Sequence, residues 1–154
     1  MISKDTVSSD AVIIEAPVGL VWEVLVDFPN YALWNTFCPS CETELVLGAP
    51  VTMQVDLGFG LQEQVEYISL IKPQEAIAWG MENKPGDPIH AVRTQYLESL
   101  GENLCSYISV DIFSVEAVDG MMELMAEKVE QGFNLCAYAL KARCEHLFGL
   151  TKNP

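Results

Sequence analysis

The stretch that decides the fold runs from Ile14 to Asn35 and reads IEAPVGLVWEVLVDFPNYALWN. We expect a short strand before Pro17 and then a helix of about two to three turns, because a proline fits the first helical turn. Apolar residues recur there every three or four positions, the spacing of one buried helix face; they are Val21, Val24, Leu25 and Phe28. Pro29 ends this helix, because the residue before a proline avoids helical dihedral angles. A second short helix then ends on Trp34.

The length and composition predict one globular domain. The chain has 154 residues, of which 50% are hydrophobic, enough for a core without disulfides or metals. No apolar run approaches the roughly 18 residues that span a bilayer. The first residues lack the basic cap and apolar block of a signal peptide, so the expected location is cytoplasmic.

Acidic residues dominate the charge. The net charge is −14, from 22 Asp and Glu against 8 Lys and Arg. Nucleic acids and anionic membrane surfaces would repel such a chain, so we expect no nucleic-acid partner and no membrane insertion. A solvated acidic surface explains the charge, and steering of a cationic substrate is the alternative.

The five cysteines include one CxxC pair, Cys38 and Cys41. An odd count without a secretory signal argues against a disulfide framework. One pair with two histidines falls short of a zinc site, and the pair follows a helix, unlike a thioredoxin-type motif. We expect two reduced thiols in a loop, with zinc or redox chemistry as alternatives. Since no P-loop, dinucleotide fingerprint or HExxH occurs, we expect neither a metal nor a cofactor.

The rest of the chain predicts strands and then one long helix. Six runs bounded by turn signals read as strands: 43–47, 51–57, 63–71, 75–81, 89–100 and 104–115. Residues 120–147 carry apolar positions every three or four residues and predict an amphipathic helix. Successive strands without crossover helices favour an antiparallel sheet, so the fold class is α+β, with the last helix covering a curved sheet.

Several short motifs carry a family resemblance. They are Lys72-Pro73 before Ile77 and Trp79, Leu97-Glu98 before Leu100-Gly101, Phe113-Ser114, Gly132-Phe133-Asn134 and Ala139–Arg143. With the opening stretch they resemble the polyketide cyclase/dehydrase branch of the START-like superfamily (SRPBCC, Bet v 1-like). That resemblance implies a helix-grip fold, ordered β-α-α-β-β-β-β-β-β-α, which holds small molecules. It implies a single domain over residues 1–154 with its core at about 7–148. Ala32, where the family often has proline, and the CxxC loop depart from the pattern.

The family's strand register implies which side chains face the interior. Its catalytic candidates are Arg93, Asp111, Glu66 and Tyr107. Its ligand-binding candidates on the strands are Met53, Val55, Gln64, Trp79, Gln95, Ser109 and Phe113, and on the final helix Met122, Met125, Val129, Phe133 and Cys136. Polar groups converging in a mostly apolar pocket are typical of a binding or active site.

Hydrophobicity alone favours the opposite register on three strands. Apolar residues alternate there with the polar set: Val65, Tyr67, Val92, Tyr96, Leu104, Ile108, Val110 and Ile112. Facing inward, they would make the cavity apolar and leave the charges in solvent. The family register instead predicts an apolar outer sheet face, which monomers rarely expose, and therefore a homodimer through that face.

Arg93 and Asp111 have two interpretations. They form an ion pair that holds the last hairpin together, or Arg93 holds a carboxylate, phenolate or enolate oxygen of a ligand. In the second case Asp111 or Glu66 is the general base, its pKa raised by burial, and Tyr107 donates a proton or orients a carbonyl. An aldol-type cyclisation, dehydration or isomerisation needs little more than these groups and a cavity that folds the substrate.

The sequence therefore predicts a protein that binds a small hydrophobic or aromatic, polyketide- or lipid-like molecule. It is a cofactor-free cyclase-like enzyme, a non-catalytic carrier or sensor, or a dimeric interaction module. Because this fold hosts enzymes and binders alike, the polarity of the cavity has to discriminate between the enzyme and the carrier or sensor. A polar lining favours catalysis, and a wholly apolar lining favours transport.

Overall fold

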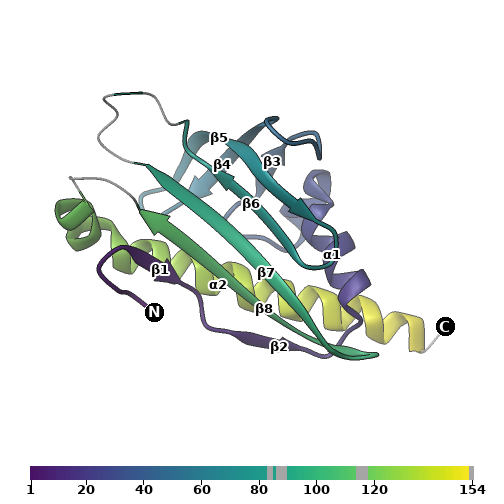
Figure 1. Ribbon diagram of the computed structural model, residues 1–154. Helices are drawn as coiled ribbons and strands as arrows, with labels where there is room; N and C mark the ends of the chain where they lie inside the picture. The colour runs from purple at the N-terminus through teal and green to yellow at the C-terminus, as the bar shows by residue number, and fades with distance from the viewer. Residues whose placement is uncertain (83–84, 86–89, 114–117, 153–154) are drawn as a thin grey trace.

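The computed structural model describes residues 1–82, 85, 90–113 and 118–152, with the backbone alone over 118–124. Its elements follow the chain as β1 (Thr6–Ser8), β2 (Val12–Ile14), α1 (Val18–Val26), the 3-10 helix η1 (Phe28–Leu33), β3 (Ser40–Glu42), β4 (Pro50–Asp56), β5 (Leu61–Lys72), β6 (Ala76–Gly80), β7 (Ala91–Gly101), β8 (Leu104–Phe113) and α2 (Val118–Lys152). The strands curve around α2, which runs behind β7 and β8 in Figure 1. The predicted α+β helix-grip fold is confirmed.

The sheet is antiparallel throughout its described strands. Their order is β1-β8-β7-β6-β5-β4-β3, and β2 pairs with β8 beside β1. From β3 to β8 each strand pairs with its neighbour in sequence, as the absence of crossover helices predicted. In the longest pairing, between β7 and β8, Arg93 lies opposite Asp111 and Gln95 opposite Ser109. The hairpin thus places the predicted polar residues side by side.

Two predicted segments differ from the structure. The N-terminal region forms two short strands where the sequence predicted one. The predicted strand over 43–47 is wrong: the strand is β3, before it, and 43–47 is irregular. Gly48, with φ of 83°, closes a turn here, and its N–H donates to the Ile68 carbonyl at 2.8 Å. The turn exposes Leu45, Val46 and Leu47, so their hydrophobicity misled a prediction that rested on composition.

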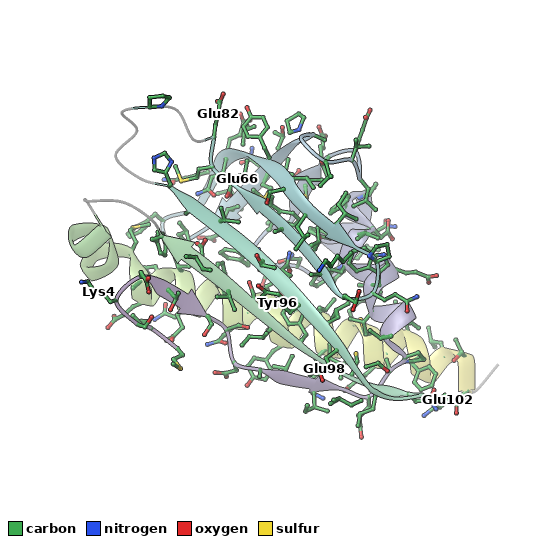
Figure 2. All side chains as sticks on the ribbon, in the orientation of Figure 1. Lys4, Glu66, Glu82, Tyr96, Glu98 and Glu102 are labelled. Carbon is green, nitrogen blue, oxygen red and sulfur yellow. The ribbon has the colours of Figure 1, made fainter. Side chains whose placement is uncertain are left out.

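The strands adopt the register in which the polar set faces inward. On β7, Arg93 and Gln95 are buried, whereas Tyr96 is 44% exposed. On β8, Tyr107 and Ser109 are fully buried, whereas Ile112 is 47% exposed. In Figure 2, Tyr96 lies on the outer face of β7, while α2 runs behind the sheet. The inward polar groups bond to one another, which allows their burial.

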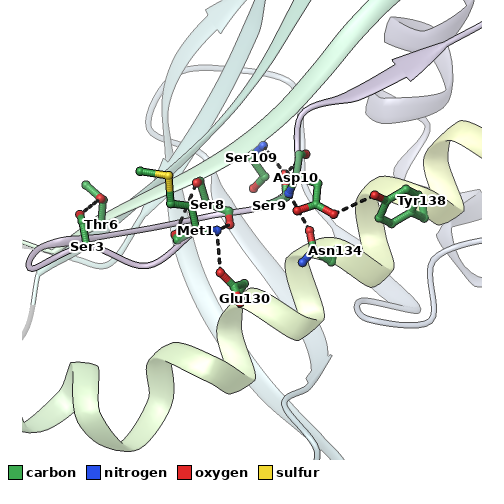
Figure 3. Close-up of polar contacts among 10 residues, drawn as sticks. All are labelled: Met1, Ser3, Thr6, Ser8, Ser9, Asp10, Ser109, Glu130, Asn134 and Tyr138. Carbon is green, nitrogen blue, oxygen red and sulfur yellow. Dashed lines mark hydrogen bonds and ion pairs between the residues drawn. The ribbon is translucent and has the colours of Figure 1, made fainter.

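The N-terminal segment connects the sheet to α2. The Ser109 N–H donates to Ser9 Oγ at 3.0 Å, and the Ser9 N–H donates to the Ser109 carbonyl at 2.9 Å. Next to Ser9, the Asp10 N–H donates to Asn134 Oδ1 at 2.6 Å, and the Tyr138 hydroxyl donates to Asp10 Oδ2 at 2.7 Å (Figure 3). Through Ser9 and Asp10, these bonds link the middle of α2 to β8.

Candidate functional site

A cavity of about 420 Å³ lies between the sheet and α2, within the range of small-molecule pockets. Its walls come from β4 to β8, from the N-terminal half of α2 and from the segment between η1 and β3. Lining residues are Phe37, Cys38, Met53, Val55, Leu57, Gln64, Val65, Glu66, Trp79, Met81, Ala91, Arg93, Asp111, Phe113, Met125, Val129 and Phe133. The walls are mostly aromatic, aliphatic and methionine side chains. Four polar residues interrupt them: Gln64, Glu66, Arg93 and Asp111.

Arg93 supplies the positive charge of the cavity and is only 8% exposed. Its Nε donates to Ser109 Oγ at 2.7 Å. The guanidinium carbon lies 4.4 Å from the centre of the Phe133 ring and 5.6 Å from that of Phe37, and both rings stabilise the cation. Arg93 Nη2 is buried and has no hydrogen-bond partner among the residues that the structure describes. An unsatisfied buried donor is costly.

A buried network fixes the direction of the guanidinium. Ser109, which accepts from Arg93, is itself fixed by the two bonds between its backbone and Ser9. Beside it the Tyr107 hydroxyl donates to Gln95 Oε1 at 2.6 Å. These bonds fix the position of Arg93 at the cavity wall, while its Nη2 has no bond in this network.

Two carboxyl groups share the cavity with Arg93. The pKa of Glu66 is raised to about 7; burial is the largest cause, the negative charge of Asp111 adds to it, and Arg93 opposes both. Burial likewise raises the pKa of Asp111 to about 6, against the effect of Arg93. Asp111 lies opposite Arg93 in the β-ladder, yet these two described side chains form no ion pair. Near neutral pH both carboxyls therefore exist in protonated and ionised forms, as proton transfer requires.

The CxxC pair is buried near the same cavity. Cys38 and Cys41 are both free thiols and 3% exposed. Cys41 belongs to β3 rather than to a loop, so that part of the expectation is wrong. Cys38 lies before the strand and lines the cavity, where its N–H donates to Asn35 Oδ1 at 2.9 Å.

Most predicted site residues lie around this cavity. Three of the strand residues do not line it: Gln95, Tyr107 and Ser109 are buried beside Arg93, where they bond to one another or to the guanidinium. Tyr107 is therefore not positioned to donate to a ligand. Cys136 is also buried outside the wall. The side chain of Met122 lies outside the described residues.

Six cavity residues were missed by the sequence prediction: Phe37, Cys38, Leu57, Val65, Met81 and Ala91. Leu57 and Ala91 continue the alternation of Val55 and Arg93, so strand periodicity could have found them. Phe37 and Cys38 lie in an irregular segment with no period to follow. Val65 lines the cavity together with both of its neighbours, which no alternating pattern predicts.

Two further features bear on the kind of site. In the part of the chain that the structure describes, no three or more His, Cys, Asp or Glu side chains are grouped to hold a metal ion. Among the described helices, none is both long and apolar enough to cross a membrane.

The structure is similar to several solved structures. An aromatase/cyclase from a Streptomyces species matches over 92% of this chain and 93% of its own, with 22% identity and a TM-score of 0.72. A START superfamily protein from Mycobacterium smegmatis matches over 93% and 99%, with 17% identity and a TM-score of 0.73. A protein from Thermus thermophilus matches over 97% and 99%, with 11% identity and a TM-score of 0.70.

By sequence, no family model matches the chain, and no curated protein matches it. The structural likenesses show that it shares the fold of the START superfamily protein and of the aromatase/cyclase. At these identities they show the fold alone, so ligand and chemistry have to be argued from the cavity.

Proposed function

We propose that the protein binds a small, largely aromatic or polyketide-like molecule in this cavity, with an oxygen of the ligand on Arg93. The observation that carries the proposal is the buried, unpartnered Nη2 of Arg93, a residue that lines a mostly apolar cavity. A carboxylate, phenolate or enolate oxygen would satisfy this donor by a charge-assisted hydrogen bond. The cation needs no further partner on its other sides, because Ser109 and two phenyl rings already contact it.

The cavity walls favour a flat apolar body on the ligand. Trp79, Phe37, Phe113 and Phe133 supply aromatic surface, and Met53 and Met125 supply side chains that adapt to irregular shapes. Trp79 is also packed edge-on against Phe28, with ring centres 6.4 Å apart, so it is a rigid wall. Such walls suit fused rings or a folded polyketone chain better than a sugar or nucleotide.

A second proposal is that the protein catalyses a cofactor-free cyclisation, dehydration or isomerisation of this ligand. The raised pKa values of Glu66 and Asp111 favour it, at about 7 and about 6. One ionised carboxyl would remove a proton next to a ligand carbonyl, and Arg93 would stabilise the enolate oxygen that forms. The other carboxyl, when protonated, would return a proton to the product or to a leaving hydroxyl.

The alternative function is a non-catalytic carrier or sensor. Substitution of the two carboxyls distinguishes this function from catalysis. If catalysis occurs, Glu66→Gln and Asp111→Asn should bind ligand but lose turnover. If the wild-type protein binds but turns over no polyketone or hydroxy-ketone offered, the carrier function remains.

Titration calorimetry with 2-naphthoate tests the binding proposal. Arg93→Met keeps the length and apolar contacts of the side chain but removes its donors. It should lose at least about tenfold in affinity, which is about 1.4 kcal/mol. The matched control is Arg143→Met, because Arg143 is the only other arginine and does not line the cavity. Equal affinity of Arg93→Met and wild type would refute the assigned role of Arg93.

We also propose a homodimer through the outer face of the sheet. Tyr96 and Ile112, on neighbouring strands, are 44% and 47% exposed there. These apolar side chains on neighbouring parts of one face support the proposal, since monomers seldom expose such a patch.

A further inference from the structure

The cavity wall contains a nucleophilic side chain that the proposed function does not use. Cys38 lines the cavity, and the loop before β3 holds it in place through the bond from its N–H to Asn35 Oδ1. Arg93, with its unpartnered Nη2, lines the same cavity. A thiol and an oxygen-binding cation thus face one ligand space, which is the arrangement needed to attack an alkene conjugated to a carbonyl.

The two thiols of the CxxC pair are chemically unequal. A hydrogen bond from Cys41 lowers the pKa of Cys38; burial opposes this, and Arg93 lowers the pKa further. The same bond to Cys38, with burial, raises the pKa of Cys41 well above its usual value. Cys38 is therefore the more acidic thiol of the pair, and Cys41 favours its ionised form. When it is protonated, the Cys38 thiol donates to the Ser40 carbonyl at 3.4 Å.

The remaining cysteines are poor nucleophiles by comparison. Burial raises the pKa of Cys105 to about 11 and that of Cys144 to about 12, and neither lines the cavity. Burial also raises the pKa of Cys136, against the effect of Arg93, and Cys136 lies outside the cavity wall.

We propose that Cys38 is a covalent capture site for α,β-unsaturated carbonyl compounds and quinones that enter the cavity. The inference rests on the proposed function, because the electrophile must first bind where Arg93 can hold its carbonyl oxygen. It goes further in assigning a bond-forming residue and the reactive class of ligand.

The reaction is an addition that needs no oxidant and has no leaving group. The Cys38 thiolate donates an electron pair to the β-carbon, so a sulfur–carbon bond forms and the carbon–carbon π bond breaks. The electrons move to the carbonyl oxygen, where Arg93 stabilises the enolate. The α-carbon then takes a proton from Glu66, Asp111 or water, which replaces the proton that the thiol lost. The product is a thioether in which S–H has added across the double bond.

N-phenylmaleimide is a suitable probe, because it combines an aromatic ring with an alkene activated by carbonyls. N-phenylsuccinimide has nearly the same shape without the alkene and serves as the unreactive control. The full-length protein is treated with one equivalent of maleimide at pH 7, and peptide mass spectrometry measures labelling at each of the five cysteines. Cys38 should label at least about tenfold faster than Cys105 and Cys144. Excess N-phenylsuccinimide should slow labelling at Cys38 alone.

Variants test the role of Cys41 as a positioning residue. Cys41→Ala should slow labelling of Cys38 at pH 7 and move its rate–pH profile to higher pH, whereas Cys41→Ser, which keeps a donor, should retain most of the rate. Cys105→Ala is the matched control and should change neither the rate nor its pH profile.

The titratable groups that influence Cys38 are Cys41 of β3, Glu66 of β5, Arg93 of β7, Cys136 of α2 and Tyr31 of η1. Labelling of wild type alone keeps the test valid if a variant does not fold.

Each outcome separates this inference from the proposed function. If calorimetry detects N-phenylsuccinimide binding but Cys38 labels no faster than Cys105, the capture site is refuted and the binding function stands. If the succinimide does not bind and labelling is uniform, both proposals fail. Fast labelling of Cys38 without protection by the succinimide would place the reaction outside the cavity and would also overturn the inference.

Discussion

The space between the sheet and α2 is filled at one end and hollow at the other. At the filled end, α1 and β2 lie against the C-terminal half of α2 (Figure 1), and Ile14, Leu25, Leu140 and Cys144 are at most 1% exposed. At the hollow end, the N-terminal half of α2 faces β4 to β8 across a cavity of about 420 Å³. The same sheet and the same helix thus form a packed core and a container.

The two ends also differ in how they treat polar groups. The filled end is apolar, so its burial adds to stability directly. The hollow end buries Arg93 and half-buries Glu66 and Asp111, without ion pairs among these described residues. Keeping such groups out of water costs stability, which is typical of sites where a ligand completes the hydrogen bonding. Substitutions at the two ends should therefore have opposite consequences for stability and binding.

The largest effect on stability is expected at the filled end. Leu140→Ala removes a fully buried side chain and should lower the free energy of unfolding by about 2–5 kcal/mol. Binding of 2-naphthoate should remain unchanged in protein that is folded. The matched control is Val129→Ala on the same helix, which lines the cavity and should cost less than half as much. Urea unfolding measures both; equal losses would show that the two ends are packed alike.

At the hollow end, removing a charge should stabilise the protein. The folded-state pKa of Glu66, about 7, lies above the usual value of 4.5, so the wild type loses stability as the pH rises through 7. Glu66→Gln cannot ionise and should be more stable than wild type above pH 8, by on the order of 3 kcal/mol, with no difference below pH 4.5. Urea unfolding of both proteins between pH 4 and 9 measures this difference in the free energy of unfolding. The control Glu63→Gln alters an exposed carboxyl of the same strand. An identical pH dependence for Glu66→Gln and wild type would contradict the raised pKa of the half-buried Glu66.

A smaller effect is expected where α2 passes the cavity wall. A Cβ at Gly132 would lie 2.3 Å from Cε1 of Phe37, so the ring would have to move. Because Phe37 contacts Phe133 and Arg93, Gly132→Ala should cost about 1–3 kcal/mol and also weaken ligand binding. Gly149→Ala, on the same helix with nothing within 4 Å, should instead leave binding intact and stabilise slightly. If the two variants behave alike, the close approach of Phe37 to the helix is incorrect.

The smallest change in stability is expected on the outer sheet face. Tyr96→Lys should alter the free energy of unfolding by no more than about 0.5 kcal/mol, because the side chain is 44% exposed. It should, however, dissociate the proposed dimer, which analytical ultracentrifugation at micromolar concentration measures. Ser99→Lys, at another exposed position of β7, is the control. A monomeric wild type would remove the dimer proposal and leave the cavity proposals untouched.

Periodicity predicted the elements well where the pattern was long. The amphipathic period of α2 and the succession of strands β4 to β8 predicted the helix, the sheet and its antiparallel pairing. The segment 43–47 failed because hydrophobic residues in an exposed turn have the composition of a strand. Short apolar runs therefore identify strands only when a period accompanies them.

The interior was harder to predict than the fold. Hydrophobicity alone would have placed Val92 and Tyr96 inside, and only the family register placed Arg93 and Gln95 there. Even then, alternation predicts which face of a strand a side chain lies on, but not whether it reaches the cavity surface. Gln95, Tyr107 and Ser109 were therefore expected on the cavity wall, although they are buried in a hydrogen-bonded network outside it. Cys38, in an irregular segment, left no periodic signal of its position.

The most direct test of the proposed ligand site is a crystal structure of the protein with 2-naphthoate. The proposal predicts the naphthyl ring inside the cavity, with a carboxylate oxygen about 2.7–2.9 Å from Nη2 of Arg93. An interior filled by side chains, with the ligand absent or bound only at the surface, would contradict it.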